Sequence, residues 1–241
     1  MAARDETYNY PRFKMSNYEL GYFPGPKAGE DVDYDYTLTD LDGNTVQLSD
    51  YKGKWLVIES GSLTCPMYVK NVKRFAALQE KYSDVEWLVV YVREAHPGEK
   101  AHQATTIEEK VAYAKRNRDD YNEARKIAVD DVKGTWHHNW GLLPNTVYVI
   151  NPDGKVVYRA DWSFAHNVDR VLSNRDEIDT NEHVVIIGAA PWITIPVTLK
   201  GGWIALYDIF KVLPKVFYEH FKLDIQTWWN KRKNKPAAAA E

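Results

Sequence analysis

The chain alternates apolar runs of strand length with amphipathic segments. Residues 55–58 and 85–92 are two such runs, and their composition is typical of strands that are buried on both faces. Between them, Val72, Phe75 and Tyr82 recur at helical spacing, with charged residues on the other faces. A strand–helix–strand unit of this kind is right-handed and places its strands parallel and adjacent. We therefore expect a parallel strand pair at the centre of an α/β sheet.

Two hairpins are predicted on either side of this unit. Residues 34–48 alternate apolar and polar positions around an Asp-Gly turn, which predicts an N-terminal β-ribbon. Residues 143–159 contain a second Asp-Gly turn between two strand-like runs. Residues 107–128 between them are charged, with a thin apolar stripe, and we expect a helix that covers the sheet, capped by Thr106. The pattern as a whole predicts a central mixed sheet flanked by helices.

Changes in composition divide the chain into three parts. Residues 1–30 are rich in Tyr, Pro, Gly and charge and are expected to form an N-terminal arm. Residues 31–172 form the predicted α/β domain, and residues 173–241 form a C-terminal aromatic and helical extension with a frayed tail.

The extension contains two distinctive segments. Residues 184–199 are uncharged, but two prolines interrupt them and they are shorter than a membrane span. We expect this segment to be buried or to face a partner, with shallow membrane contact as the lesser alternative. Residues 203–229 are amphipathic and aromatic, which predicts a helix broken near Pro214.

Charge and cysteine content limit the classes of partner and of cysteine chemistry that the protein can have. With 31 basic and 34 acidic residues the net charge is −3, which argues against a nucleic-acid partner. The single cysteine excludes an internal disulfide and a Cys-x-x-Cys pair. The first 14 residues are polar and lack the apolar core of a signal peptide, which favours the cytoplasm.

The single cysteine follows the first apolar run directly. Gly61 permits a sharp turn, and Pro66 is suited to the first position of a helix, so Cys65 is expected at or beside the N-cap. Backbone N–H groups and the positive end of a helix dipole should then lower the pKa of the thiol and make it a nucleophile. The alternative is that Cys65 is a small buried apolar side chain.

A second group of polar residues follows the second apolar run. Glu94 and His96 come after the strand at residues 85–92 just as Cys65 comes after the strand before it. Because parallel strands end at the same edge of the sheet, we expect these side chains to lie near Cys65. Trp136 and His137 could wall an aromatic pocket or simply pack. Adjacent histidines point in different directions, so we expect no metal site there.

Taken together, these segments resemble the thioredoxin-like fold in its redoxin branch over about residues 33–172. Within that branch, the chain is similar to the iodothyronine deiodinase family. That family carries Gly-Ser-x-Thr-selenocysteine-Pro, here Gly-Ser-Leu-Thr-Cys-Pro at residues 61–66. It also carries Tyr-x-x-Glu-Ala-His-Pro, here Tyr-Val-Arg-Glu-Ala-His-Pro at residues 91–97.

The resemblance implies reductive removal of a halogen, typically iodide, from an aromatic ring. Cys65 would be the nucleophile, and an external thiol such as glutathione or thioredoxin would regenerate it, with no bound cofactor. The candidate catalytic residues are Cys65, His96, Glu94, Thr64 and Ser62. The candidate substrate-binding residues are Tyr91, Trp136, His137 and Arg159. The expected partners are a small halogenated aromatic substrate and the thiol reductant, and a homodimer is left open.

The chain departs from the family pattern at three places. Cysteine replaces selenocysteine, so a weaker nucleophile and a slower reaction are expected. A further histidine of the family falls at about Ala104, with His102 offset, and an acidic residue of the family falls at Asn145. These departures affect the identity of the substrate more than the fold.

Three other functions compete with dehalogenation. A one-cysteine peroxidase is the first: Ser62 could replace the threonine of the peroxiredoxin motif, but Ile58 stands where that motif has proline. The Gln and Trp motifs of glutathione peroxidases are not evident. A non-catalytic binding module is the second. A thiol–disulfide oxidoreductase is disfavoured because a resolving cysteine is missing.

Overall fold

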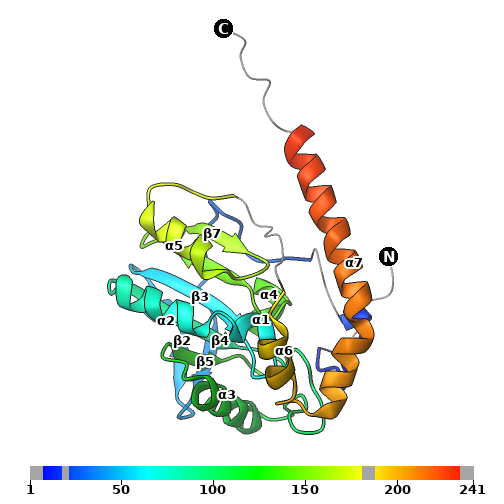
Figure 1. Ribbon diagram of the computed structural model, residues 1–241. Coiled ribbons are helices and arrows are strands. Elements are labelled where there is room, and N and C mark those ends of the chain that lie inside the picture. The colour runs from blue at the N-terminus through cyan, green and yellow to red at the C-terminus, as the bar shows by residue number, and fades with distance from the viewer. Residues whose placement is uncertain (1–7, 18–21, 181–187, 234–241) are drawn as a thin grey trace.

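A seven-stranded mixed sheet forms the centre of the molecule, a computed structural model that describes residues 8–17, 22–180 and 188–233 (Figure 1). The strand order is β2-β1-β5-β4-β3-β6-β7. β3, β4 and β5 run parallel, whereas the other pairs are antiparallel. The fold is thioredoxin-like, and the strands are β1 (Thr37–Asp40), β2 (Thr45–Gln47), β3 (Trp55–Gly61), β4 (Val85–Tyr91), β5 (Lys126–Val129), β6 (Val147–Ile150) and β7 (Val156–Ala160).

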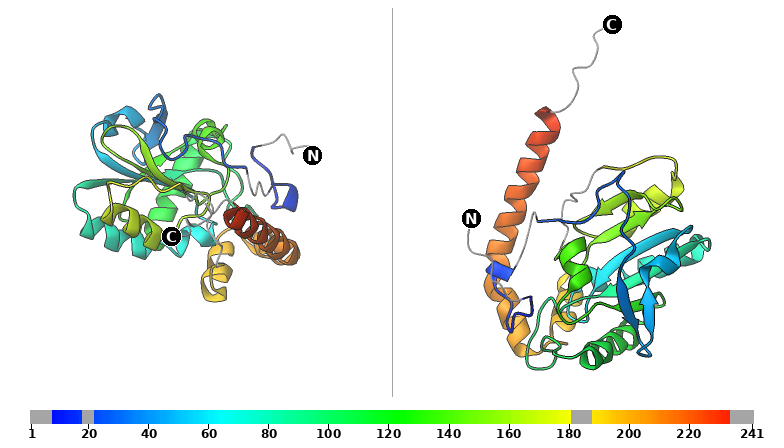
Figure 2. Two further views of the ribbon diagram at one scale, coloured as in Figure 1. Left: turned by 90° about the horizontal axis from the view of Figure 1, so that it is seen from above. Right: turned by 180° about the vertical axis from the view of Figure 1, so that it is seen from behind.

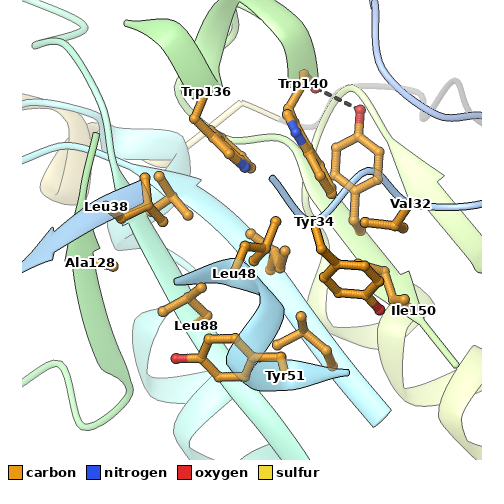
Figure 3. Packing of buried hydrophobic residues seen from close by; sticks show 14 of the residues in the cluster. Val32, Tyr34, Leu38, Leu48, Tyr51, Leu88, Ala128, Trp136, Trp140 and Ile150 are labelled. Carbon is orange, nitrogen blue, oxygen red and sulfur yellow. Dashed lines mark hydrogen bonds between the residues drawn. The ribbon is translucent and has the colours of Figure 1, made fainter. Parts of the chain in front are cut away.

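Helices cover both faces of the sheet. Side chains at alternate strand positions point to opposite faces, so Val57 packs with α2 and α5, whereas Leu56 and Ile58 pack with α4. Figure 3 shows the second cluster, in which Trp136 and Trp140 lie above Leu48 and Leu38. The helices are α1 (Pro66–Val69), α2 (Val72–Lys81), α3 (Ile107–Tyr121), α4 (Thr135–Trp140), α5 (Ala165–Ser173), α6 (Pro191–Thr198) and α7 (Trp203–Lys233), with 3-10 turns η1 (Met15–Asn17) and η2 (Leu48–Tyr51).

The central predictions hold. β3 and β4 are parallel neighbours over their full lengths, and both expected hairpins form. The Thr106 hydroxyl accepts a hydrogen bond from the Glu109 N–H at 3.3 Å and caps α3.

The expected end of the helix over residues 107–128 is wrong. α3 stops at Asn122, which adopts the left-handed conformation (φ 53°) that commonly ends helices. Ile127 and its neighbours then form β5, which pairs in parallel with β4. The apolar residues assigned to the helix stripe belong to a short buried strand.

The C-terminal extension forms two helices beside this core. α7 runs along the periphery of the molecule, and α6 contacts both α7 and α1 (Figure 1). The expected break at Pro214 is wrong, because α7 continues through it. Pro214 lies on an exposed side of the helix, where water can reach the carbonyl that loses its N–H partner. Among the described residues, no helix has the length and apolar character needed to cross a membrane.

Some predicted segments cannot be compared with the structure. Residues 1–7 and 18–21 of the arm, residues 181–187 of the extension and the expected tail at residues 234–241 lie outside the described residues.

Candidate active site

Cys65 lies at the N-cap of α1, directly after the turn that follows β3. Pro66 occupies the first helical turn, as the sequence predicts. Gly61 at the end of β3 is required for space, because a Cβ there would lie 2.7 Å from the ring of Tyr68. The strand, the turn and the short helix together fix the thiol at the carboxyl end of the parallel strands.

The loop that follows β4 is hydrogen-bonded to the Cys65 turn. The Thr64 N–H and hydroxyl both donate to one carboxylate oxygen of Glu94, at 3.0 and 2.6 Å. The His96 N–H donates to the Thr64 hydroxyl at 3.0 Å, and the Ala95 N–H donates to the Ser62 hydroxyl at 3.2 Å. The structure therefore brings Ser62, Thr64, Glu94 and His96 to the turn that carries Cys65.

Glu94 and Tyr91 lie behind this turn. The Tyr91 hydroxyl donates to Glu94 and accepts a hydrogen bond from the Leu63 N–H at 3.1 Å. Burial raises the pKa of Glu94, and the hydrogen bonds from Thr64 and Tyr91 oppose this shift. Both side chains are almost fully buried and neither lines the cavity at Cys65. They position the turn and do not face a substrate.

A small cavity of about 50 Å³ lies against Cys65. His96 lines the same cavity, together with Phe13, Met67 and Trp162. The His96 Nδ1 atom is buried and has no hydrogen-bond partner among the residues that the structure describes. Burial lowers the pKa of His96 to about 4, against the opposing charge of Asp208. The imidazole is therefore neutral near pH 7 and can accept a proton.

The predicted lowering of the Cys65 pKa is wrong. The side chain is 2% exposed, and burial raises the pKa of the thiol to about 12. Hydrogen bonds from the backbone of Tyr68 and Met67 oppose the shift but are outweighed. α1 has a single turn of four residues, so its dipole is small. The resting thiol is protonated, and a base must remove its proton before it can act as a nucleophile.

A larger apolar groove of about 340 Å³ adjoins this cavity. The two share Phe13, Pro66, Met67, His96 and Trp162 as lining residues. The outer wall of the groove comes from α6 and α7, including Ile195, Leu213, Val216 and Phe217. No part in the active site was predicted for this extension from the sequence, although its helical spacing of aromatic residues signalled an apolar face.

Hydrogen bonds fix the start of α7 against the His96 loop. The Glu99 carboxylate accepts from the N–H groups of Trp203 and Ile204, at 2.6 and 3.0 Å. A Cβ at Gly201 would lie 2.4 Å from the His96 carbonyl oxygen, so this close approach requires glycine. The extension is thereby attached to the loop that carries the candidate base.

The N-terminal arm closes the same region. Arg12 forms a two-point ion pair with Asp208 of α7, with one N···O distance of 2.8 Å. The ring of Phe13 packs edge-on against the ring of His96, with centroids 4.8 Å apart. Phe13 was not expected at the site, because the irregular N-terminal arm carries no recognisable periodicity.

Three expected substrate-binding residues lie elsewhere. Trp136 stacks on Trp140 in the core on the other face of the sheet (Figure 3). His137, beside it on α4, bonds to the Tyr8 hydroxyl at 2.9 Å. Arg159 on β7 donates to the Gly25 carbonyl at 2.8 Å and holds the N-terminal segment. None of the three lines the cavity or the groove, because their elements pack away from the carboxyl end of β3.

A buried ionic cluster that the sequence analysis missed lies beneath the turn. Arg125 donates to Glu59 and to Glu123, both at 2.6 Å, and all three side chains are buried. Asn145 donates to the other oxygen of Glu59 at 3.0 Å, and Tyr68 of α1 donates to Glu123 at 2.7 Å. A glutamate inside the apolar run at residues 55–61 was the available signal. Buried carboxylates are rarely tolerated without such partners.

The other positions at which the chain departs from the deiodinase pattern lie away from the Cys65 thiol. The ring of His102 is more than half exposed and faces Glu109 at 3.1 Å. Ala104 is buried and offers no polar side chain. Within the described ranges, no group of three or more His, Cys, Asp or Glu side chains is arranged to hold a metal ion.

Comparison with known proteins identifies the family. The sequence model of the iodothyronine deiodinase family matches residues 26–174, which include both motifs and all seven strands. The chain belongs to the iodothyronine deiodinase family. α6 and α7 lie outside the matched region.

More distant similarities extend beyond the deiodinase family. A probable glutathione peroxidase 2 of Arabidopsis thaliana is 27% identical over 146 residues, which covers 52% of this chain and 81% of that protein. A secreted Mycobacterium tuberculosis disulfide oxidoreductase superposes with a TM-score of 0.47 and 12% identity, over 58% of this chain and 96% of the other. A Cys-to-Ser mutant of PrxQ from Xylella fastidiosa gives 0.49 and 14%, over 63% and 98%. Membership of the deiodinase family and the peroxidase similarity make this chain a thiol-dependent oxidoreductase.

Proposed function

We propose that this deiodinase-family protein removes iodide reductively from an iodinated phenol, with Cys65 as the nucleophile. One observation carries the proposal: the thiol and the unpartnered Nδ1-bearing ring of His96 line one cavity that adjoins an apolar groove. A nucleophile, a neutral base and space for an aromatic ring are the three components that the reaction needs.

The proposed reaction couples the proton transfer to the attack on iodine. His96 accepts the proton of Cys65 as the sulfur attacks the iodine atom of the substrate, because the raised pKa of the thiol and the lowered pKa of the imidazole disfavour a separate earlier transfer. A sulfur–iodine bond forms as the carbon–iodine bond breaks, and the ring carbon takes the electron pair of that bond. The proton held by His96 then passes to the ring carbon, which leaves a neutral imidazole and the deiodinated phenol.

An external thiol completes the cycle. It attacks the sulfur–iodine group, releases iodide and a proton, and forms a mixed disulfide with Cys65. A second thiol reduces that disulfide and leaves as the oxidised partner. Because Cys65 is the only cysteine of the sequence, the resolving thiol must come from another molecule.

The groove supports an aromatic substrate. Its volume of about 340 Å³ falls at the lower end of the range for small-molecule sites. Met67, Trp162 and Phe217 offer apolar contacts to a ring, whereas His96 lies where the groove meets the cavity. The buried Glu94 and Thr64 act as positioning residues for the turn.

A peroxidase reaction is the second candidate, favoured by the similarity to the glutathione peroxidase of Arabidopsis thaliana. There the thiolate of Cys65 would attack a peroxide oxygen and become a sulfenic acid, and the other oxygen would leave as an alcohol after taking a proton. Two external thiols would restore the thiol and release water.

One pair of assays separates the candidates. The purified protein is incubated with a dithiol and an iodinated phenol, and separately with the dithiol and hydrogen peroxide, beside the variant Cys65→Ala. Iodide release that disappears in the variant supports dehalogenation. Peroxide consumption without iodide release supports the peroxidase, and inactivity in both assays supports a non-catalytic binding module.

A further inference from the structure

One exposed face of α7 carries aromatic residues along the helix, and two of them, Phe210 and Phe217, also line the groove over the active site. Trp203 is 68% exposed and Phe221 is 65% exposed, although large aromatic side chains are usually buried. Exposed aromatic residues recur along the helix at intervals of three, four or seven, which places them on one side. We name this the aromatic stripe; its members are Trp203, Tyr207, Phe210, Phe217, Phe221 and Trp228.

An adjacent side of the same helix faces the protein. Ile209, Leu213, Val216 and His220, also spaced by three or four, line the groove over the active site. Trp203, Tyr207, Phe221 and Trp228 are not among the groove-lining residues, so contact with the groove does not explain the stripe. Figure 2 shows α7 at the periphery in both views, with one side away from the other elements. An exposed apolar surface of this length marks an interaction site.

Basic residues accompany the stripe. Lys211, Lys215 and Lys222 are exposed on α7 and follow one another along one flank of the stripe. Residues 188–235 contain eight Lys or Arg and three Asp or Glu, which leaves 23 basic and 31 acidic residues in the rest of the chain. Residues 188–235 are thus positively charged, whereas the remainder of the protein is negatively charged.

We propose that the aromatic stripe of α7 lies in the interface of an anionic lipid membrane. A helix with aromatic residues on one face and lysines beside them has the composition of interfacial membrane helices. Tryptophan and tyrosine favour the headgroup level, and lysines are attracted to acidic lipids. Trp192 of α6 is a further exposed tryptophan, 78% exposed. The length and prolines of residues 184–199 argued against a membrane span and left shallow membrane contact as the lesser alternative.

Charge favours lipid over a second copy of this chain. If two copies paired through the stripe, the lysine rows beside it would approach one another and repel. Anionic headgroups would instead neutralise Lys211, Lys215 and Lys222 while the rings enter the acyl boundary. The proposal concerns where the protein binds, and it does not depend on which reaction Cys65 performs.

Vesicle sedimentation tests the proposal on the full chain. The probes are vesicles of phosphatidylcholine alone and of phosphatidylcholine with phosphatidylserine. We expect binding to the mixed vesicles that weakens with added salt, and at least about tenfold weaker binding to the neutral ones. The combined variant Lys211→Glu, Lys215→Glu and Lys222→Glu is expected to bind the mixed vesicles at least about tenfold less tightly.

Two further variants make the test specific. The control Lys52→Glu, Lys73→Glu and Lys133→Glu changes three exposed lysines of the thioredoxin-like domain and should bind within about twofold of wild type. The variant Trp203→Ser, Tyr207→Ser and Phe221→Ser, at positions outside the groove lining, should lose vesicle binding and keep the circular dichroism of the folded protein.

Three results would overturn the proposal. The first is no binding to the mixed vesicles. The second is equal loss of binding in the control and in the α7 lysine variant. The third is a wild-type protein that does not bind vesicles and forms a dimer in analytical ultracentrifugation, whereas the aromatic variant is a monomer. That result would assign the stripe to contact with a second copy of this chain.

Discussion

Thr64 donates two hydrogen bonds to one carboxylate oxygen of Glu94, from its N–H at 3.0 Å and from its hydroxyl at 2.6 Å. The same hydroxyl accepts the His96 N–H at 3.0 Å. One side chain therefore links the turn after β3 to the loop after β4. This link places the candidate nucleophile and the candidate base on one cavity.

Thr64→Val removes the hydroxyl while it keeps the shape of the side chain. The variant leaves the His96 N–H without its partner and removes one of the two hydrogen bonds to the Glu94 oxygen, so the free energy of unfolding should fall by about 2 kcal/mol. Chemical denaturation measures this change. Thr37→Val is the matched control, because its hydroxyl bond to Gln47 is exposed, and it should stay within about 0.5 kcal/mol. Equal losses in both variants would show that the Thr64 hydroxyl contributes no more to the free energy of unfolding than an exposed hydroxyl does.

The low pKa of His96 predicts acid sensitivity. Its folded-state pKa of about 4 lies below the unfolded value of 6.5. Between these values the unfolded state binds the extra proton, so the stability contributed by the neutral ring is present above pH 6.5 and is lost as pH falls towards 4. The loss should reach about 3 kcal/mol in wild type relative to His96→Gln. If the difference in free energy of unfolding between wild type and His96→Gln stays constant from pH 6.5 to 4, this result would contradict the burial of a neutral His96.

The buried cluster of Glu59, Arg125 and Glu123 predicts a large structural effect. Arg125→Met leaves two buried carboxylates without their cation and should lower the free energy of unfolding by about 3 to 5 kcal/mol. Lys54→Met breaks an exposed pair with Glu86 and should cost less than about 1 kcal/mol. Denaturant titration compares the two. A small effect of Arg125→Met would mean that the carboxylates are protonated in the folded protein.

If the groove binds the substrate, a change in its wall should alter KM and leave kcat nearly unchanged. Val216→Trp fills part of the groove wall and should raise the KM for an iodinated phenol about tenfold, with kcat within about twofold. Lys215→Trp places the same bulk on an exposed position of α7 and should leave both constants near those of wild type. Initial-rate kinetics of the two variants provide the comparison. Equal KM values in the two variants would exclude the groove as the substrate site.

The sequence predicted the elements that carry strong local patterns. Residues 55–58 and 85–92 became the parallel pair β3 and β4 because continuous apolar runs and a crossover helix leave few alternatives. The position of Cys65 at the N-cap followed from Pro66. β5 was missed because its four residues carry too short a pattern to distinguish a strand from the end of a helix.

The electrostatics of the site could not be predicted in the same way. The pKa of Cys65 depends on desolvation, and the cavity against the thiol is walled by residues that are distant in sequence, such as Phe13 and Trp162. Trp136 and Arg159 are aromatic and basic residues of the expected kinds, but the packing of α4 and β7 turns them away from the thiol. Side-chain chemistry indicated the candidates, and tertiary packing selected among them.

The most direct test of the account is a single turnover without reductant. In that condition water hydrolyses the proposed sulfur–iodine group, releases iodide and leaves a sulfenic acid that dimedone traps. Mass spectrometry after incubation with an iodinated phenol should find dimedone on Cys65 and an amount of deiodinated phenol that matches the protein, and Cys65→Ser should give neither. Deiodinated phenol formed equally by Cys65→Ser, or an unmodified Cys65 with no product, would contradict the central claim that this thiol takes the iodine.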